Sequence, residues 1–164
     1  MEADSIERAR ISVATAVLRR YDEHLPGTRR PRIAAYVPLR TEPGSTALLA
    51  GLIERGAEVI TPVLLRDNDL DWEVWNGDGT RLGIDAIAGS ALVLVPALAV
   101  DHEGVRLGRG GGSYDRALVR VPADVPTAAL LFDGEVLEAV PHEPWDVPVS
   151  AAVTPSGWVD LRGK

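Results

Sequence analysis

The residues best able to do chemistry lie in one short run, Arg106-Leu-Gly-Arg-Gly-Gly-Gly-Ser-Tyr-Asp-Arg116. Four of the five residues from Gly108 to Gly112 are glycine, and the exception is Arg109. Glycine lets a ligand approach the main chain closely. Consecutive backbone N–H groups beside arginines, ahead of a helix start, form a cradle for an anion. The run therefore predicts an anion site, and phosphate is the expected anion.

The spacing of this run leaves two interpretations open, a phosphate loop and an ordinary tight turn. It lacks the Gly-Lys-Ser/Thr ending of a P-loop, and no acidic residue follows at the distance that a dinucleotide fingerprint requires. Ser113 is expected to cap the next helix. Asp115 would then lie in the first turn, where a carboxylate is stabilised. An acid beside a phosphate cradle is also a candidate Mg²⁺ ligand.

Composition narrows the class of protein. The 164 residues predict one domain, residues 1–164, and a net charge of −7 without a broad basic face argues against nucleic acid as a partner. The chain has no cysteine, and its three histidines show no metal-ligand spacing. No segment approaches the about 20 apolar residues of a membrane span. The acidic N-terminus does not resemble a signal peptide, so we expect a cytoplasmic protein without a membrane partner.

The elements that must position the glycine run alternate between helix and strand. Helices are expected at 5–24, 43–55, 84–88 (a short one) and 113–119, the first capped by Ser5 and ended by Pro26-Gly27. Strands are expected at 32–38, 58–65, 91–96, 127–132 and 151–153, and Asn76-Gly77 signals a hairpin between Trp75 and Arg81. The pattern predicts an open α/β layered fold with parallel βαβ units, in which ligands bind beyond the carboxyl ends of strands.

A longer string around the run, Val95 to Leu118, resembles the signature of the 5-formyltetrahydrofolate cyclo-ligase family, also called 5,10-methenyltetrahydrofolate synthetases. It has the family's order of Val-Pro, an aspartate, a glycine, Arg-Leu-Gly, the glycine run and Tyr-Asp-Arg. Further segments resemble the family in the right order, namely Tyr36-Val-Pro, Thr41-Glu-Pro-Gly-Ser-Thr46, Thr61-Pro62 and Pro141-His-Glu-Pro-Trp-Asp-Val-Pro148. The likeness runs from about residue 32 to residue 155.

The resemblance implies a fold, an activity and its cofactors. The fold would be a single three-layer αβα domain with a mostly parallel open sheet, of the kind also seen in NagB-RpiA-like proteins. The activity would use ATP and Mg²⁺ to convert 5-formyltetrahydrofolate, a reduced folate, to 5,10-methenyltetrahydrofolate, with release of ADP and phosphate. Phosphorylation of the formyl oxygen would make it a good leaving group, and the folate N10 would then attack. The protein would act as a monomer or homodimer.

The resemblance also implies roles for particular residues. The ATP loop would consist of Arg106, Leu107, Gly108, Arg109, Gly110, Gly111, Gly112, Ser113 and Tyr114, with Arg109 and Tyr114 as catalytic residues. The folate would contact Val37, Glu42, Arg109, Gly110, Gly111, Gly112 and Ser113. Asp115 and Asp146 would be Mg²⁺ ligands. Structural alternatives stay open for four side chains: Glu42 as an acid that favours a helix start, Asp146 as a turn acid, Tyr114 as a core residue, and Trp72 as a half-buried hairpin residue rather than a platform for the pteridine ring.

The chain departs from the family pattern at several places. Family members usually begin with a helix whose lysine and arginine grip the ATP phosphates, whereas the only lysine here is Lys164. The candidates to replace them are Arg8, Arg10, Arg19 and Arg20, although arginine and lysine are not interchangeable at phosphate sites. The segment at residues 80–88 is shorter than the family's usual segment at this place. Three positions hold residue types that are less common there in the family, namely Ser113, Trp145 and Ser150. An active ligase and a non-catalytic relative that binds nucleotide or folate are therefore both retained, ahead of a sugar-phosphate isomerase-like enzyme.

Overall fold

A computed structural model describes residues 2–25, 27 and 29–161. Helix α1 covers Ala3–His24, α2 Thr46–Glu54 and α3 Ser113–Leu118, with a 3₁₀ helix η1 at Ala86–Gly89. The strands are β1 (Arg32–Ala34), β2 (Glu58–Leu64), β3 (Leu70–Val74), β4 (Leu92–Pro96), β5 (Ala99–Asp101), β6 (Arg106–Leu107), β7 (Thr127–Leu130), β8 (Val136–Leu137), β9 (Ala151–Thr154) and β10 (Gly157–Asp160).

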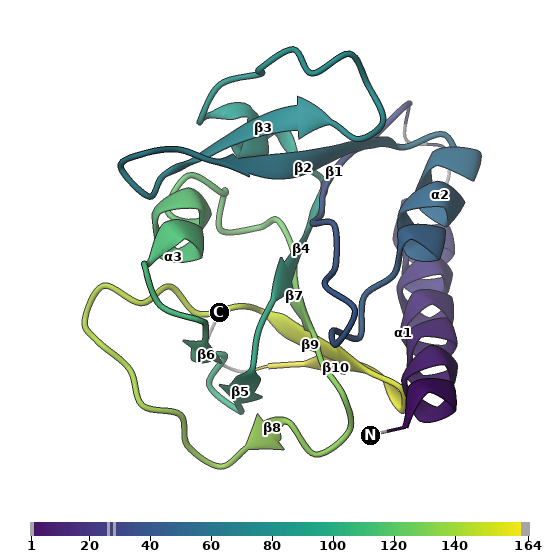
Figure 1. Ribbon diagram of the computed structural model, residues 1–164, viewed down its shortest axis with the longest axis vertical. Coiled ribbons are helices and arrows are strands. Elements are labelled where there is room, and N and C mark those ends of the chain that lie inside the picture. The colour runs from purple at the N-terminus through teal and green to yellow at the C-terminus, as the bar shows by residue number, and fades with distance from the viewer. Residues whose placement is uncertain (1, 26, 28, 162–164) are drawn as a thin grey trace.

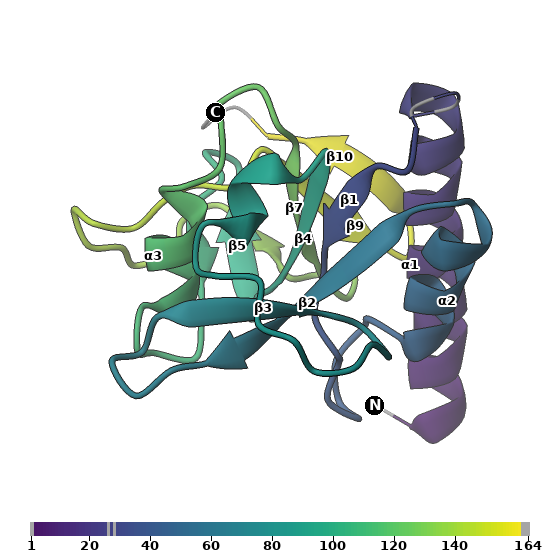
Figure 2. The same cartoon turned by 90° about the horizontal axis from the view of Figure 1, so that it is seen from above.

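Seven strands form the main sheet in the order β10-β9-β7-β4-β1-β2-β3. The five inner strands are parallel to one another, and the two edge strands, β10 and β3, are antiparallel to their neighbours. Helices α1 and α2 lie side by side on one side of this sheet, while α3 and the small sheet β6-β5-β8 lie on the other (Figures 1 and 2). The predicted mostly parallel, layered α/β fold is therefore confirmed.

The two faces of the sheet bury separate apolar cores because successive side chains of a strand point to opposite faces. In β4, Leu92 and Leu94 join the core under α1 and α2, whereas Val93 and Val95 join the core under α3. The same alternation runs through β1, β7 and β9. These strands are covered on both faces, which explains why they are nearly continuous apolar runs in the sequence.

The helices begin and end where local chemistry requires it, with one exception. Ser45 caps α2, because its hydroxyl accepts a hydrogen bond from the Leu48 N–H at 3.2 Å. The expected Ser5 cap is wrong: α1 begins at Ala3, and its N-cap residue Glu2 makes no side-chain cap bond. Pro26, expected to help end α1, lies outside the described residues, as does Lys164. Among the described residues, no helix combines the length and the apolar character that crossing a membrane requires.

The predicted hairpin at Asn76-Gly77 is misplaced. The hairpin instead joins β2 and β3, and its turn lies at residues 65–69, closed by a hydrogen bond from the Leu65 N–H to the Asp69 carbonyl at 2.9 Å. Asn68 takes the left-handed conformation in this turn (φ 68°), which asparagine tolerates better than most residues. Trp72, on β3, is fully buried rather than half-buried, and its indole N–H has no hydrogen-bond partner among the residues that the structure describes.

Candidate active site

A cavity of about 490 Å³ opens at the carboxyl ends of β1 and β4. Its walls come from the loop between β1 and α2, the residues that follow β4, the glycine run and the segment before β9. The residues that the resemblance assigned to the ATP loop, the folate site and the metal site all lie in its lining: Val37, Glu42, all ten residues from Arg106 to Asp115, and Asp146. Segments distant in sequence thus meet at one edge of the sheet, as parallel topology requires.

The glycine run presents bare backbone to this cavity. Gly110, Gly111 and Gly112 have φ angles of 98°, 84° and 69°. A Cβ added to Gly110 or Gly112 would meet nothing within 4 Å, so the backbone conformation, not crowding, requires glycine there. Among the described residues, the N–H groups of residues 109–112 donate no hydrogen bond. Gly112 rather than Ser113 occupies the N-cap position of α3, so the expected Ser113 cap is wrong.

Arg106 is held in a fixed orientation below the run. Its side chain is 7% exposed, and Nη1 donates to the Pro96 carbonyl at 3.1 Å. Nη2 lies 3.9 Å from the Asp115 Oδ1, and the guanidinium stacks 5.5 Å from the centre of the Tyr114 ring. Burial lowers the pKa of Arg106, and the carboxylate of Asp115 opposes that shift. The buried Nε of Arg106 has no partner among the described residues, so it remains available to a ligand.

Two buried phenols also line the cavity, Tyr36 after β1 and Tyr114 in α3. The hydroxyls of Tyr36 and Tyr114 have no partner among the described residues, and both side chains line the cavity. Burial, reinforced by the charge of Glu42, raises the pKa of Tyr36 well above its ordinary value. Burial likewise raises the pKa of Tyr114, although Arg106 opposes the shift. Both hydroxyls are therefore protonated at neutral pH and able to donate a hydrogen bond.

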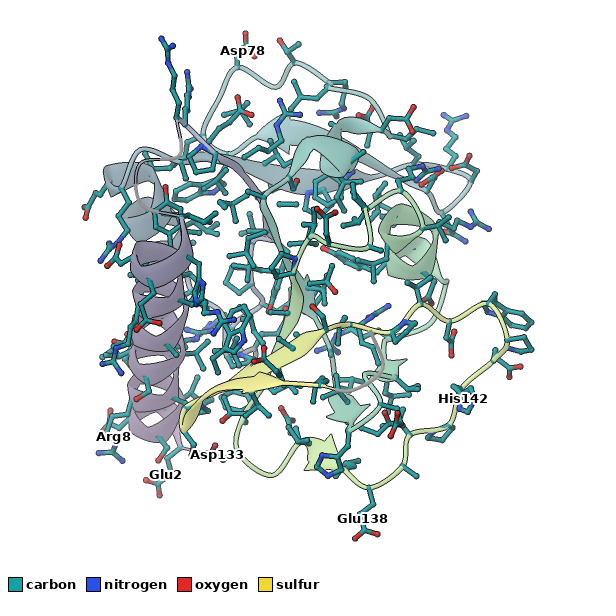
Figure 3. All side chains as sticks on the ribbon, turned by 180° about the vertical axis from the view of Figure 1, so that it is seen from behind. Glu2, Arg8, Asp78, Asp133, Glu138 and His142 are labelled. Atoms are coloured by element: carbon teal, nitrogen blue, oxygen red, sulfur yellow. The ribbon has the colours of Figure 1, made fainter. Side chains whose placement is uncertain are left out.

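The two acids expected to bind metal lie in different structural elements, Asp115 in helix α3 and Asp146 in a turn before β9. Asp115, in the first turn of α3, accepts a hydrogen bond at Oδ1 from the Val147 N–H at 3.1 Å. Asp146 closes a turn, since its Oδ2 accepts from the Glu143 N–H at 2.8 Å. This segment swings outward past Glu138 and His142 before it returns to β9 (Figure 3). Within the described part of the chain, no group of three or more acidic, histidine or cysteine side chains could hold a metal ion.

Glu42 braces a turn rather than a helix. Ser45 caps α2, and the Glu42 carboxylate accepts a hydrogen bond from the Leu39 N–H at 2.7 Å. The residue is 8% exposed. Sequence reasoning did not single out Tyr36 or Leu39, which also line the cavity. Tyr36 falls inside the strand predicted at 32–38 and in the family-like segment Tyr36-Val-Pro, and Leu39 directly follows that predicted strand. These signals do not distinguish a wall residue from a core residue.

None of the four α1 arginines considered as substitutes for the family lysine lines the cavity. Arg8 contacts Ser5, and Arg20 stacks over the Trp158 ring at 4.8 Å. Arg19 lines a separate hollow on the surface of α1. Arg10 binds backbone carbonyls of the loop that carries Glu42. At the mouth of the cavity, the Trp145 side chain is 66% exposed.

The turn after β5 supports the glycine run. Asp101 accepts hydrogen bonds at Oδ1 from the N–H groups of Glu103 and Val105, both at 3.0 Å. Gly104 has φ 85°, and a Cβ there would lie 2.1 Å from the Val149 carbonyl oxygen. The Val149 N–H donates to the Gly104 carbonyl at 2.8 Å. This contact fixes the turn before Arg106 against the segment that carries Asp146.

Comparison with solved structures shows the fold class. The chain is similar to a 5,10-methenyltetrahydrofolate synthetase from Mycoplasma pneumoniae, with a TM-score of 0.78 and 16% identity, covering 94% of this chain and 90% of that one. It is also similar to the Aquifex aeolicus 5,10-methenyltetrahydrofolate synthetase, with a TM-score of 0.72 and 24% identity over 99% and 86% of the two chains.

Sequence comparison then shows the family. The model of the 5-formyltetrahydrofolate cyclo-ligase family matches residues 3–155. A protein of Mycolicibacterium smegmatis named 5-formyltetrahydrofolate cyclo-ligase is 40% identical over 149 residues, which cover 79% of this chain and 77% of the relative. The chain belongs to the 5-formyltetrahydrofolate cyclo-ligase family, a family of ligases.

Proposed function

We propose that this protein uses ATP and Mg²⁺ to convert 5-formyltetrahydrofolate to 5,10-methenyltetrahydrofolate, with release of ADP and phosphate. The observation that carries the proposal is the set of residues that lines the cavity at the carboxyl ends of β1 and β4. One part of its wall is open glycine backbone with a buried arginine, and another part carries two carboxylates. A third part, from the loop after β1, supplies Val37 and Glu42.

The first part of the wall suits the phosphates of ATP. Among the described residues, the N–H groups of residues 109–112 and the Nε of Arg106 donate no hydrogen bond. They can therefore donate hydrogen bonds to the oxygens of a phosphate. Arg109 lies in the lining beside them. Leu107, Gly108 and Ser113 complete this proposed ATP loop, and the residues from Arg109 to Ser113 also border the folate.

The donor set also fits Mg²⁺, which prefers oxygen ligands and usually keeps water and phosphate oxygens in its coordination sphere. Asp115 and Asp146 line the same cavity and supply two carboxylates, so they would hold the ion together with the nucleotide. When bound, ATP and Mg²⁺ supply an activated phosphoryl group and screen its negative charge.

The chain's own residues would orient the reactants and donate protons. Val37 would pack against the pterin, and Glu42 would accept a hydrogen bond from one of its N–H groups. The protonated Tyr114 hydroxyl would donate to an oxygen of the reacting groups, and Arg109 would neutralise the charge that develops on them. The task is mainly positioning and charge neutralisation, for which a preorganised cavity is effective.

A second candidate function is a family relative that binds nucleotide or folate without turnover. The observation in its favour is that Arg8, Arg10, Arg19 and Arg20 all lie outside the cavity lining. A direct assay separates the two candidates. Purified protein is mixed with 5-formyltetrahydrofolate, ATP and Mg²⁺, and the absorbance of the methenyl product is followed. No product at high protein concentration, with an active family member as control, would contradict the ligase proposal.

Calorimetric titration of ATP and of the folate in separate experiments then tests the binding alternative. Binding of either ligand without turnover would support it. No heat and no shift in melting temperature with either ligand would rule it out.

Substitution of Asp115 tests the proposed metal site. Asp115→Asn keeps an oxygen that can accept from the Val147 N–H, so the anchor of the neighbouring segment should survive. It removes the charge that Mg²⁺ requires, and kcat/KM should fall about a hundredfold. Trp72→Phe is the control, since Trp72 lies in the core away from the cavity lining, and it should change kcat/KM by about twofold or less. Equal, mild effects of both substitutions would show that Asp115 has only a structural role.

A further inference from the structure

Arg10 joins two segments about thirty positions apart in the sequence. It lies on α1, and its side chain is 20% exposed. Its Nε donates to the Glu42 carbonyl at 3.0 Å, while Nη2 donates to the carbonyls of Leu39 and Arg40 at 2.9 and 2.8 Å. One guanidinium therefore binds three of the four carbonyl groups in the turn at residues 39–42.

The turn at residues 39–42 is also closed from within. The Glu42 N–H donates to the Leu39 carbonyl at 3.1 Å, and the Glu42 carboxylate accepts from the Leu39 N–H at 2.7 Å. The backbone of the turn and the carboxylate of Glu42 thus form one hydrogen-bonded unit. The carbonyl dipoles on its outer side converge on Arg10, which neutralises them with donors of fixed geometry.

The inner side of the same turn belongs to the cavity. Leu39 and Glu42 both line the cavity, and Glu42 is 8% exposed. A carboxylate that must accept a hydrogen bond from a ligand is effective only when its orientation is set before binding. Arg10 itself does not line the cavity, so any influence on the ligand must pass through this turn.

We propose that Arg10 is a positioning residue for the folate side of the cavity: it holds the turn at residues 39–42 so that Glu42 and Leu39 face the substrate before it arrives. This inference rests on the proposed function. It also assigns Arg10 a role different from that of the family's phosphate-gripping residues, because Nε and Nη2 are engaged with carbonyls and Nη1 lies 4.0 Å from Glu7 Oε2.

A matched pair of substitutions on the same helix tests the proposal. Arg10→Gln removes the three carbonyl contacts, whereas Arg20→Gln removes an equal charge and a tertiary contact, the stacking on Trp158, away from the cavity. Hydrogen exchange of the ligand-free proteins reports on the Leu39 and Glu42 amides. Arg10→Gln should speed their exchange about tenfold or more, Arg10→Lys should have a smaller effect, and Arg20→Gln should leave it unchanged. Equal exchange in Arg10→Gln and Arg20→Gln would overturn the proposal.

Steady-state kinetics give a second, independent readout. Arg10→Gln should raise KM for 5-formyltetrahydrofolate about tenfold, with kcat and the KM for ATP close to wild type. Arg10→Lys should recover part of the loss. A rise in the KM for ATP instead would overturn the proposal in favour of a phosphate-binding role. Lack of turnover by the wild-type protein would contradict the proposed function, while the exchange comparison would still decide whether Arg10 holds the turn.

Discussion

Two segments of the cavity wall are held in opposite ways. The turn at residues 39–42 is fixed by hydrogen bonds on both sides, from Arg10 outside and from the Glu42 carboxylate within. In the glycine run, by contrast, the N–H groups of residues 109–112 donate to no other described residue, and their φ angles are those that glycine allows. The turn at residues 39–42 is therefore preorganised, whereas the glycine run keeps its N–H donors available to a ligand.

This difference matches the chemistry proposed for the two walls. A folate ring system is rigid and neutral over much of its surface, so a wall of fixed shape can select it. A polyphosphate is flexible and highly charged, and it can satisfy open backbone donors as it binds. The glycine run is open at its centre but fixed at both ends, by the turn at Gly104 and by α3.

The largest effect is expected at the fixed end before the run. Gly104→Ala would place a Cβ 2.1 Å from the Val149 carbonyl oxygen, and neither group is a flexible side-chain end. The left-handed φ of 85° adds strain. We expect a loss of about 3 kcal/mol or more in the free energy of unfolding, measured by urea denaturation.

Gly110→Ala is the matched control for this substitution. Its φ of 98° carries the same kind of strain, but a Cβ there would meet nothing within 4 Å. It should cost about 1 kcal/mol. Equal losses at the two positions would show that the contact between Gly104 and Val149 does not fix the run.

A smaller effect is expected at the far end, where α3 is attached to the β2–β3 turn. Arg120, just past α3, donates to both carboxylate oxygens of Asp69 at 2.8 and 2.7 Å. These hydrogen bonds lower the pKa of Asp69 below its ordinary value of 3.8. A lowered folded-state pKa gives stability that is present above the unfolded-state value and is lost as pH falls through the folded-state pKa.

The free energy of unfolding should therefore fall below about pH 4, and Asp69→Asn should flatten this part of the pH profile. At neutral pH the substitution should cost about 2 kcal/mol, because hydrogen bonds between charged groups are lost. Urea denaturation between about pH 6 and about pH 2 measures both effects. An unchanged acid profile in Asp69→Asn would show that the pair does not hold α3.

The smallest effects are expected from the two buried phenols. The hydroxyls of Tyr36 and Tyr114 have no partner in the described part of the chain. Tyr36→Phe and Tyr114→Phe should therefore leave the stability of the ligand-free protein within about 1 kcal/mol of wild type. Tyr114 belongs to the glycine-run side, and its hydroxyl is proposed to meet the reacting groups. Tyr114→Phe should lower kcat/KM about tenfold, and Tyr36→Phe should lower it less. A larger loss of kcat/KM in Tyr36→Phe than in Tyr114→Phe would show that Tyr36, and not Tyr114, donates the hydrogen bond to the reacting groups.

The strands that could be predicted from the sequence are those whose pattern is local and repetitive. The runs around Val59, Leu94 and Ala129 are buried on both faces, and their apolar continuity identifies them. The two- and three-residue strands β5, β6 and β8 are too short to show a period, and the sequence pattern predicts neither them nor β3 and β10. The hairpin was misplaced because Asn76-Gly77 is a strong local signal, while the true turn depends on the pairing of β2 with β3.

The residues of the candidate site also fall into those that local sequence predicts and those that it does not. The glycine run and the acids Asp115 and Asp146 stand out because their residue types and spacing are local features of the chain. The contact from Arg10 to the turn at residues 39–42 spans about thirty positions and uses backbone carbonyls, which have no signature in the sequence. Tyr36 lies in an apolar run that also predicts a core residue. Such features become visible only when the fold brings the segments together.

The position of α1 against the last strands also bears on how the chain folds as it is synthesised. α1 packs against β9 and β10 as well as α2, although more than 120 positions separate α1 from these two strands. Until residues 151–160 have left the ribosome, part of the apolar stripe that contains Val13 and Val17 has no partner. Contacts between segments so far apart in the sequence form slowly, because the intervening chain must be ordered first. During synthesis, α1 therefore exposes part of its apolar face until β9 and β10 have been made.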